Sequence, residues 1–517
     1  MPYPFYNKEF EFTQPDGTKI RLRGWGHQNY AVFETLDGFT VTMNPATGYY
    51  EYAKLSADES FLEPTGIRVG LVDPAVLGIK KHIKISKEAA KRESRMAYHR
   101  MAATTRWEQR RQEAKQAKRM ALMSKGILPA PPKEETKGDY IGLCILVQFP
   151  DVSGTIPQSE VEKFCNMKGY TGFGNAGSVH DYFFDISEGK LNYTNIVTQY
   201  YTAKNPRAYY TNRSIPQPVR ARELILEALK DLKAKGFDFS SLSMDNGGFI
   251  YSLNIFYAGP IVNNWAEGLW PHSWHLNTPF DVGNGKKFYD YQITNMGDEL
   301  TLATFCHENG HMICSFPDLY DYGYESYGVG NYCLMCFGGG DAKNPVQVDA
   351  YLKYKAGWAN QVTPLTDGIY TANAGKNEFF ILFNNTNKYE YFIIENRHKE
   401  NRDKSLLSSG LAIWHVDELG SNNNEQMTRE EHYECSLEQA DGRSDLEHKV
   451  NLDDSTDLFN KNTGSKFGDS TKPNSKWWDG TPSGLEISDI GEAGREITFR
   501  GVSQKKVPTV REATLAR

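Results

Sequence analysis

Two histidines and a glutamate stand at a spacing that could bind and use a metal ion. They are His307, Glu308 and His311, in the segment His-Glu-Asn-Gly-His. On a helix, imidazoles four residues apart project from one face and can bind one zinc ion at about 2.0–2.1 Å. Glu308 lies next to the first ligand and can take a proton from a water on that ion as the water attacks a carbonyl. The pattern therefore predicts a helix beginning near residue 300 that carries a hydrolytic zinc centre.

A catalytic zinc needs a third protein ligand, and two aspartates follow this helix. Pro317 ends the helix, and the turned chain can bring a carboxylate back to the metal. Asp318 is the preferred ligand. Asp321 is the alternative, and it could instead hydrogen-bond the backbone of the turn. Farther on, Met335 ends a Gly-rich bend and could either lie under the metal or simply fill the core.

Other polar groups near the motif admit two interpretations. Cys306, Cys314, Cys333 and Cys336 could form a thiolate metal site, but buried packing is favoured because the chain holds one close Cys pair. His272 and His275 could line a cleft or serve the core equally well. The turn at residues 245–248, Asp-Asn-Gly-Gly, makes Ca²⁺ a second candidate cofactor, although a plain turn is favoured.

Length and composition describe a globular chain of several domains. The 517 residues suggest about three domains. A net charge of −7 gives no reason to expect nucleic acid as a partner. The sequence contains no apolar run of about 18 residues, which excludes a membrane-spanning helix. Its first residues lack the features of a secretory signal, so either the protein stays inside the cell or the signal lies outside this sequence.

Periodicity and turn residues predict an α+β multidomain fold. Residues 1–79 read as a small β-rich module, with strands expected at 20–22, 30–33, 39–43 and 49–52. Residues 80–138 read as a basic helical connector with a Pro-rich linker at 126–132.

Residues 139–362 alternate strands with helices, as in an α/β catalytic domain of the zincin type. The strands are expected at 141–149 and 249–257, and the helices at 159–166, 179–186 and 218–235. Residues 363–501 return to strands and predict a β-sandwich-like part, followed by a polar tail at 502–517. These strands are expected at 379–383, 389–395, 410–416, 485–487 and 496–499.

The connector has an unusual charge. Residues 80–125 hold 15 Lys or Arg against four Glu, without Gly or Pro, which predicts a basic helical segment. Its charges are scattered around the helix and form no clear amphipathic stripe. A solvated connector is therefore favoured over a nucleic-acid or membrane contact. The dibasic step Arg110-Arg111 makes the segment a good target for a trypsin-like protease.

The chain resembles the immune inhibitor A family of secreted zinc metallopeptidases, a metzincin-like group. The resemblance extends over nearly the whole chain. It is carried by the zinc helix and by residues 14–18, 36–39, 141–151, 179–191, 269–272, 317–321, 328–335, 356–358, 394–397, 410–418 and 439–442.

The resemblance implies zinc bound by His307, His311 and an aspartate, with Glu308 as general base. It also implies secretion, protein or peptide substrates, and a prosegment of about 138 residues that is removed on maturation. Cys314 stands where the family pattern has Gly, and one extra residue precedes Asp318. Because Cys144 is the first cysteine, a prosegment thiolate cannot silence the zinc. A carboxylate, an imidazole such as His27, or steric blockage must do so.

Three functions are compatible with these patterns. The leading one is a zinc metalloendopeptidase made as a zymogen. The second is a catalytically idle relative that binds other proteins through its β-rich parts, although the intact His307, Glu308 and His311 argue against it. The third is a zinc hydrolase of bonds other than peptides, for which the sequence offers no phosphate loop or paired carboxylates.

Overall fold

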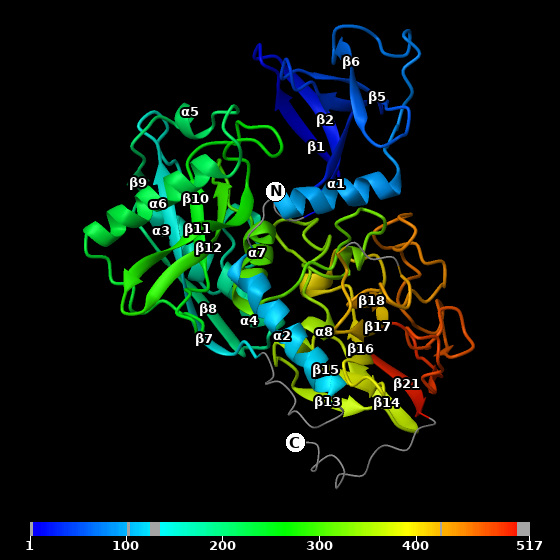
Figure 1. Cartoon of the computed structure of the whole chain (residues 1–517). Coiled ribbons are helices and arrows are strands. Elements are labelled where there is room, and N and C mark those ends of the chain that lie inside the picture. The colour runs from blue at the N-terminus through cyan, green and yellow to red at the C-terminus, as the bar shows by residue number, and fades with distance from the viewer. Residues whose placement is uncertain (1–3, 101–103, 125–134, 424–426, 504–517) are drawn as a thin grey trace.

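The computed structural model describes residues 4–100, 104–124, 135–423 and 427–503. Over these ranges the protein is a mixed α/β chain with four β-sheets (Figure 1). The Pro-rich linker expected at 126–132 and all but the first two residues of the 502–517 tail lie outside the described residues.

An antiparallel six-stranded meander forms the N-terminal part. Short apolar runs pack inward around Phe12, Leu22 and Phe33, and polar turns reverse the chain between them. The strands are β1 (Phe5–Thr13), β2 (Lys19–Gly26), β3 (Ala31–Thr35), β4 (Thr40–Met43), β5 (Tyr50–Leu55) and β6 (Leu62–Arg68). β1 and β6 were not predicted, whereas the inner four strands match the expected runs.

Two helices follow where one basic segment was expected: α1 (Lys87–Arg100) and α2 (Arg106–Met123). Thr105 and Glu108 form a reciprocal capping box, so the start of α2 is fixed locally. In Figure 1, α1 lies beneath the N-terminal sheet, and α2 runs between the central and C-terminal sheets, close to α7.

The central sheet has the order β11-β12-β10-β7-β8, with β9 also paired to β7. β12, β10, β7 and β8 are parallel, and β11 is an antiparallel edge strand. The bounds are β7 (Gly138–Gln148), β8 (Leu191–Val197), β9 (Tyr201–Thr202), β10 (Leu253–Tyr257), β11 (His272–Gly283) and β12 (Lys286–Asn295).

Helices cover both faces of this sheet. Leu143 and Ile145 of β7 pack toward α6, whereas the alternate residues Cys144 and Leu146 pack into the cluster that includes α3, α4 and α7. The helices are α3 (Gln158–Asn166), η1 (Gly172–Gly174), α4 (Val179–Ile186), α5 (Arg207–Tyr210), α6 (Val219–Ala234), α7 (Leu302–Cys314), η2 (Gly330–Tyr332) and α8 (Ala350–Lys355). The expected helices at 159–166, 179–186 and 218–235 are thus confirmed as α3, α4 and α6. The hairpin β11–β12 was missed.

Two further sheets pack against each other in the C-terminal part. Phe392 and Ile413 of one sheet meet Ile497 and Phe499 of the other in a common core. The sheets have the orders β13-β15-β16-β17-β18 and β14-β21-β20-β19. Their elements are β13 (Gln361–Pro364), β14 (Gly368–Asn373), β15 (Glu378–Phe383), β16 (Glu390–Arg397), η3 (Asn401–Asp403), β17 (Gly410–Asp417), β18 (Cys435–Leu437), β19 (Phe467–Gly468), β20 (Leu485–Ser488) and β21 (Glu496–Ser503).

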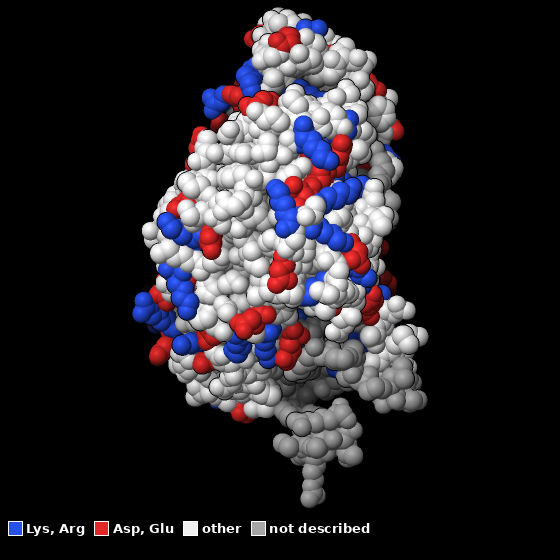
Figure 2. Space-filling model, turned by 90° about the vertical axis from the view of Figure 1, so that its left-hand side faces the viewer, with Lys and Arg blue, Asp and Glu red and all other residues white. Residues whose placement is uncertain are grey.

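The expected absence of a membrane-spanning helix is consistent with the described helices. Within the described ranges, the helices are too short or too polar to cross a bilayer. On the face drawn in Figure 2, acidic and basic side chains are interspersed.

A buried arginine connects the C-terminal sheet to the chain that follows α7. Arg397 at the end of β16 is fully buried. Its guanidinium bonds both carboxylate oxygens of Asp403 at 2.6 Å and donates to the carbonyl of Tyr332 at 3.0 Å. Tyr332 belongs to the short η2 turn that leads to Met335, so this arginine positions the chain that lies under α7.

Arg397→Ala should lower the free energy of unfolding by about 3–5 kcal/mol, because it leaves the buried carboxylate of Asp403 uncompensated. The matched control is Arg500→Ala, whose pair with Asp367 is largely exposed and should contribute at most about 1 kcal/mol. Thermal and urea unfolding of both variants measures the difference. Equal losses would contradict the positioning role of Arg397.

Candidate metal centre

The helix α7 brings the two histidines of the motif together in the interior. His307 and His311 are 1% and 4% exposed, and their Nε2 atoms lie 3.1 Å apart. The Nδ1 atom of His307 lies 3.0 Å from the carbonyl of Leu334, and that of His311 lies 2.7 Å from the carbonyl of Phe316. A carbonyl accepts only, so each Nδ1 carries its proton. In the neutral rings both Nε2 lone pairs therefore face the same point.

The end of α7 turns Asp318 toward that point. Ser315 adopts a left-handed conformation with φ of 53° and ends the helix at Cys314, a role that glycine most often fills. Oδ1 of Asp318 then lies 3.2 Å from Nε2 of both histidines. The other oxygen, Oδ2, accepts a hydrogen bond of 2.6 Å from the hydroxyl of Tyr322. The preferred third ligand thus lies with the two histidines.

Asp321, the alternative ligand, faces elsewhere. Its carboxylate accepts backbone N–H groups from Gly323 at 2.7 Å, Glu325 at 3.0 Å and Ser326 at 3.1 Å. Burial raises its pKa to about 7. These contacts give Asp321 the turn-stabilising role that was its second interpretation.

The three converging atoms fit a zinc ion. A tetrahedral zinc with ligands at about 2.0–2.1 Å separates those ligands by about 3.3 Å, close to the observed distances of 3.1, 3.2 and 3.2 Å. Among the described residues, Oδ1 of Asp318 has no hydrogen-bond partner although it is buried. Three electron-pair donors in such contact repel one another unless a cation or proton lies between them. Two imidazoles and one carboxylate are also a ligand set that zinc commonly takes.

Glu308 lies beside this group without joining it. Its carboxylate is 1% exposed and approaches Nε2 of His307 at 3.9 Å. Its Oε1 has no hydrogen-bond partner within the described part of the chain. Burial raises the pKa of Glu308, and the neighbouring histidines oppose this effect. A buried carboxylate with a raised pKa and a vacant acceptor is suited to taking and returning a proton.

Met335 lies directly under the metal helix. A side-chain carbon added at Gly310, between the two histidines, would approach the sulfur of Met335 to 2.9 Å. Glycine at this position therefore lets Met335 pack against the backbone of α7. The Met-containing bend expected from the sequence thus packs against the helix that carries the two histidines.

The N-terminal part closes the site from above. A cavity of about 30 Å³, roughly the volume of one water, lies against the candidate ligands. Its walls come from both sides of the prosegment boundary expected near residue 138: Gln28, Asn29, Thr105, Trp107 and Glu108 on one side, and Ser273, Trp274, Glu308, His311, Asp318 and Tyr322 on the other.

Trp107, in the first turn of α2, stacks on a candidate zinc ligand. Its ring lies 4.3 Å from that of His311, with an angle of 16° between the planes. The backbone N–H groups of Arg106 and Trp107 donate to the buried carboxylate of Asp290 on β12 at 2.7 and 3.0 Å. Asp290 thus binds the free N–H groups at the start of α2 and holds the indole over the metal position.

The prediction that the connector is solvated was wrong for α2. Arg111 and Lys115 each approach the buried Glu434 to 2.7 Å, and Lys118 approaches Glu418 to 2.6 Å. Burial would raise the pKa of Glu434, but these cations hold it well below its usual range. The charges that looked scattered in sequence therefore match carboxylates beside β17 and β18 of the C-terminal part.

The end of α7 and the turn at 245–248 are also bonded to α2. Arg110 donates to the carbonyl of Met312 at 2.7 Å and to the hydroxyl of Ser315 at 3.0 Å. Arg106 pairs with Asp245 at 2.7 Å, and Asp245 also accepts the N–H groups of Gly247 and Phe249. The carboxylate considered for Ca²⁺ thus serves a plain turn and an arginine.

His27 lies close to the site, but its ring nitrogens point to backbone groups. Its Nε2 lies 3.0 Å from the carbonyl of Tyr322, its Nδ1 accepts the N–H of Asn29, and burial lowers its pKa to about 4. Both ring nitrogens of His27 are therefore bonded to backbone groups and not to the candidate ligands. His272 lines a pocket next to the metal site, and His275 stacks on Tyr289 within the β11–β12 hairpin.

Sequence reasoning missed Trp107, Gln28 and Tyr322 as neighbours of the site. A possible signal was that Trp107 is the one tryptophan in the basic segment 80–125.

The seven cysteines are all buried and unpaired, and within the described residues the groupings able to hold a metal contain none of them. One such grouping is the three candidate ligands, and another joins Asp441, Asp454 and Asp457.

Searches against protein-family models and curated proteins found no match to this chain.

We predict that the chain binds one zinc ion and that Asp318→Ala loses it, whereas Asp321→Ala keeps it. Loss of a supporting residue costs about 10–100-fold in metal affinity, so loss of a ligand should exceed 100-fold. Metal analysis after competition with a chelator measures both variants. The proposed ligand set is wrong if zinc is lost from Asp321→Ala alone.

Proposed function

We propose that the protein is a zinc-dependent metalloendopeptidase, made as a zymogen, that hydrolyses peptide bonds of proteins. Membership of the immune inhibitor A-like group and secretion belong to the same proposal. The observation that carries it is the convergence of His307, His311 and Asp318 on one point, with the buried carboxylate of Glu308 beside it.

Each residue has a role in this reaction. His307, His311 and Asp318 would hold the zinc, and the carbonyls of Leu334 and Phe316 fix the orientation of the two rings. A zinc ion in such a site polarises a substrate carbonyl and lowers the pKa of a bound water to about 7.

Glu308 would move the proton. Its carboxylate accepts a proton from the attacking water as the water oxygen bonds to the carbonyl carbon. It returns that proton to the amide nitrogen as the carbon–nitrogen bond breaks. The products are a carboxylic acid and an amine. Burial of Glu308 favours its protonated form and so supports this transfer in both directions.

The covered cavity supports synthesis as a zymogen. Trp107 lies on His311, and Gln28 and Asn29 approach from the loop between β2 and β3, leaving room for about one water and no peptide. Substrate access therefore requires residues of both segments to leave. An inhibitor contributed by the chain itself suits an enzyme that would otherwise attack proteins during synthesis.

Glu308→Gln should abolish casein cleavage while zinc is retained. Loss of a general base costs about 100- to 10,000-fold in turnover, and the amide keeps the shape of the side chain. The chain is activated by limited trypsin treatment, trypsin is then inhibited, and zinc content and cleavage are measured together. Glu162→Gln, exposed on α3, is the matched control and should remain active. Zinc binding without cleavage by the activated wild type would instead favour the idle, binding function.

Trp107→Ala should raise the activity of the uncut chain. Stacking of aromatic rings contributes about 0.5–1.5 kcal/mol, so its loss should increase basal cleavage about two- to thirteenfold. Met120→Ala, on the same helix but exposed, controls for a general effect on α2 and should change nothing. After trypsin activation all forms should be equal. An unchanged basal rate in Trp107→Ala would rule out the indole as part of the block.

A further inference from the structure

A second pocket adjoins the metal site on the side of β11. It is lined by Gln28, Gln217, Pro218, Trp265, Ala266, Trp270, Pro271, His272, Ser273 and Trp274. Gln28, Ser273 and Trp274 also line the metal cavity, so the two spaces lie on either side of these shared residues. Ser273 also lies beside the carboxylate of Glu308. A side chain bound in this pocket would therefore belong to a residue close to the bond under attack.

Aromatic residues of the N-terminal sheet cover the walls of this pocket. Phe33 packs on Trp265, with ring centres 6.0 Å apart, and Phe10 packs on Trp270 at 5.8 Å. When the N-terminal part leaves, these indole faces lose their cover and become exposed apolar surface beside the metal. The two indoles therefore already pack against aromatic rings, those of Phe33 and Phe10, within the chain.

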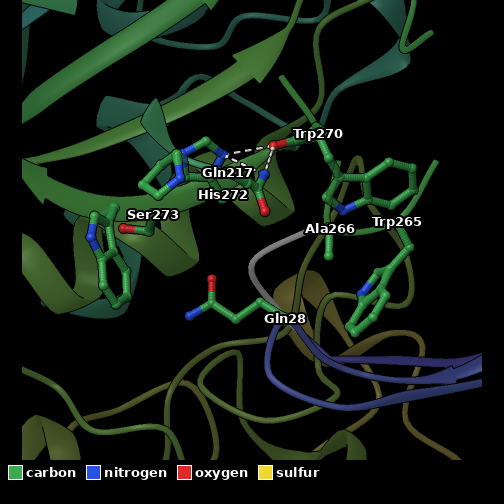
Figure 3. Close-up of a pocket in the computed structure, with 10 residues that line it drawn as sticks. Gln28, Gln217, Trp265, Ala266, Trp270, His272 and Ser273 are labelled. Carbon is green, nitrogen blue, oxygen red and sulfur yellow. Dashed lines mark hydrogen bonds between the residues drawn. The ribbon is translucent and has the colours of Figure 1, made fainter. Parts of the chain in front are cut away.

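Gln28 lies between the walls of the pocket, but its amide oxygen lacks a hydrogen-bond partner there. In Figure 3 its side chain extends from the N-terminal loop into the space between Ser273 and Ala266. Its Oε1 is buried, yet the described part of the structure offers it no hydrogen-bond donor. A buried amide oxygen without a donor is unfavourable, so the pocket is better suited to an apolar group of similar or larger size.

The pocket also lacks charge to bind a charged side chain. None of its described lining residues is Asp, Glu, Lys or Arg. His272 is buried and hydrogen-bonds the carbonyl of Trp270 at 2.7 Å, and burial lowers its pKa to about 4, so it is neutral at pH 7. A charged group would lose its hydration here without gaining a partner.

We propose that this tryptophan-lined pocket is the specificity pocket of the activated enzyme and binds an aromatic side chain of the substrate next to the cleaved bond. The inference rests on the proposed peptidase function. Flat walls formed by Trp265 and Trp270 can stack on an aromatic ring, and the neutral lining rejects Asp, Glu, Lys and Arg.

The test compares peptides that differ at one position. Full-length protein is activated with trypsin, trypsin is inhibited, and kcat/KM is measured for peptides with Phe, Ala or Asp at each position flanking the cleaved bond. At one of these positions Phe should exceed Asp by about 100-fold, the scale on which an apolar pocket discriminates. Equal kcat/KM for all three residues at every position would overturn the inference while leaving the peptidase function intact.

Variants assign the preference to this pocket. Trp265→Ala should lower kcat/KM for the Phe peptide about tenfold and leave the Ala peptide unchanged, and Trp265→Phe should restore most of the loss. Trp265 is partly exposed, which limits the effect on folding, and melting temperatures check this. Trp478→Ala, in the C-terminal part and stacked on His415, is the control.

A binding measurement distinguishes recognition of the side chain by the pocket from the rate of bond cleavage. The activated Glu308→Gln variant should bind the Phe peptide more tightly than the Asp peptide by a similar factor, detected by tryptophan fluorescence. A preference for Phe that survives unchanged in Trp265→Ala would overturn the assignment. Failure of the wild type to cleave any peptide would overturn both the function and this inference.

Discussion

Three electron-pair donors held within about 3.2 Å of one another, away from water, are the constraint on which the structure depends. Without a cation, the lone pairs on His307, His311 and Asp318 would repel. The fold holds them together by several means. The left-handed Ser315 turns the chain, Gly310 admits Met335, and backbone carbonyls fix the imidazoles. The central sheet and the C-terminal sheets support these contacts.

The buried pair of Arg397 and Asp403 supports the site from the C-terminal side. Arg397 bonds the carbonyl of Tyr332 and thereby connects the C-terminal sheets to the bend under α7. The C-terminal part is thus physically tied to the candidate site. Its two packed sheets give the bend a rigid support, in contrast to a mobile loop.

The sequence predicted what depends on short-range spacing. Histidines four residues apart specify one face of a helix, and alternating or continuous apolar runs specify the strands at 141–149, 379–383 and 410–416. Asp318 could be preferred over Asp321, but the sequence could not show that Asp321 accepts three backbone N–H groups. The turn that brings Asp318 to the histidines depends on the left-handed residue at 315, which is a serine and gave no glycine signal.

Features that depend on distant partners escaped prediction. α2 looked solvated because its own sequence contains no apolar stripe, yet Glu434, Glu418 and Asp245 provide its partners from far along the chain. The hairpin β11–β12 was missed because β11 mixes His, Asn and Asp with aromatic residues and does not alternate. Its two strands pack against α6 and α2, which come from other parts of the chain.

The position of α2 determines whether one cleavage of the chain is enough to uncover the candidate metal site. Its ion pairs reach Asp245 near the central sheet and Glu418 on the C-terminal sheet, and cleavage between α2 and β7 breaks none of them. Before the cut, the N-terminal segment that covers the site is part of the same chain and is held at high effective concentration. After the cut it is a separate chain, which leaves the site only by dissociating. Release of the cover would then depend on protein concentration and ionic strength as well as on cleavage. Processing and activation would be two successive events with different controls.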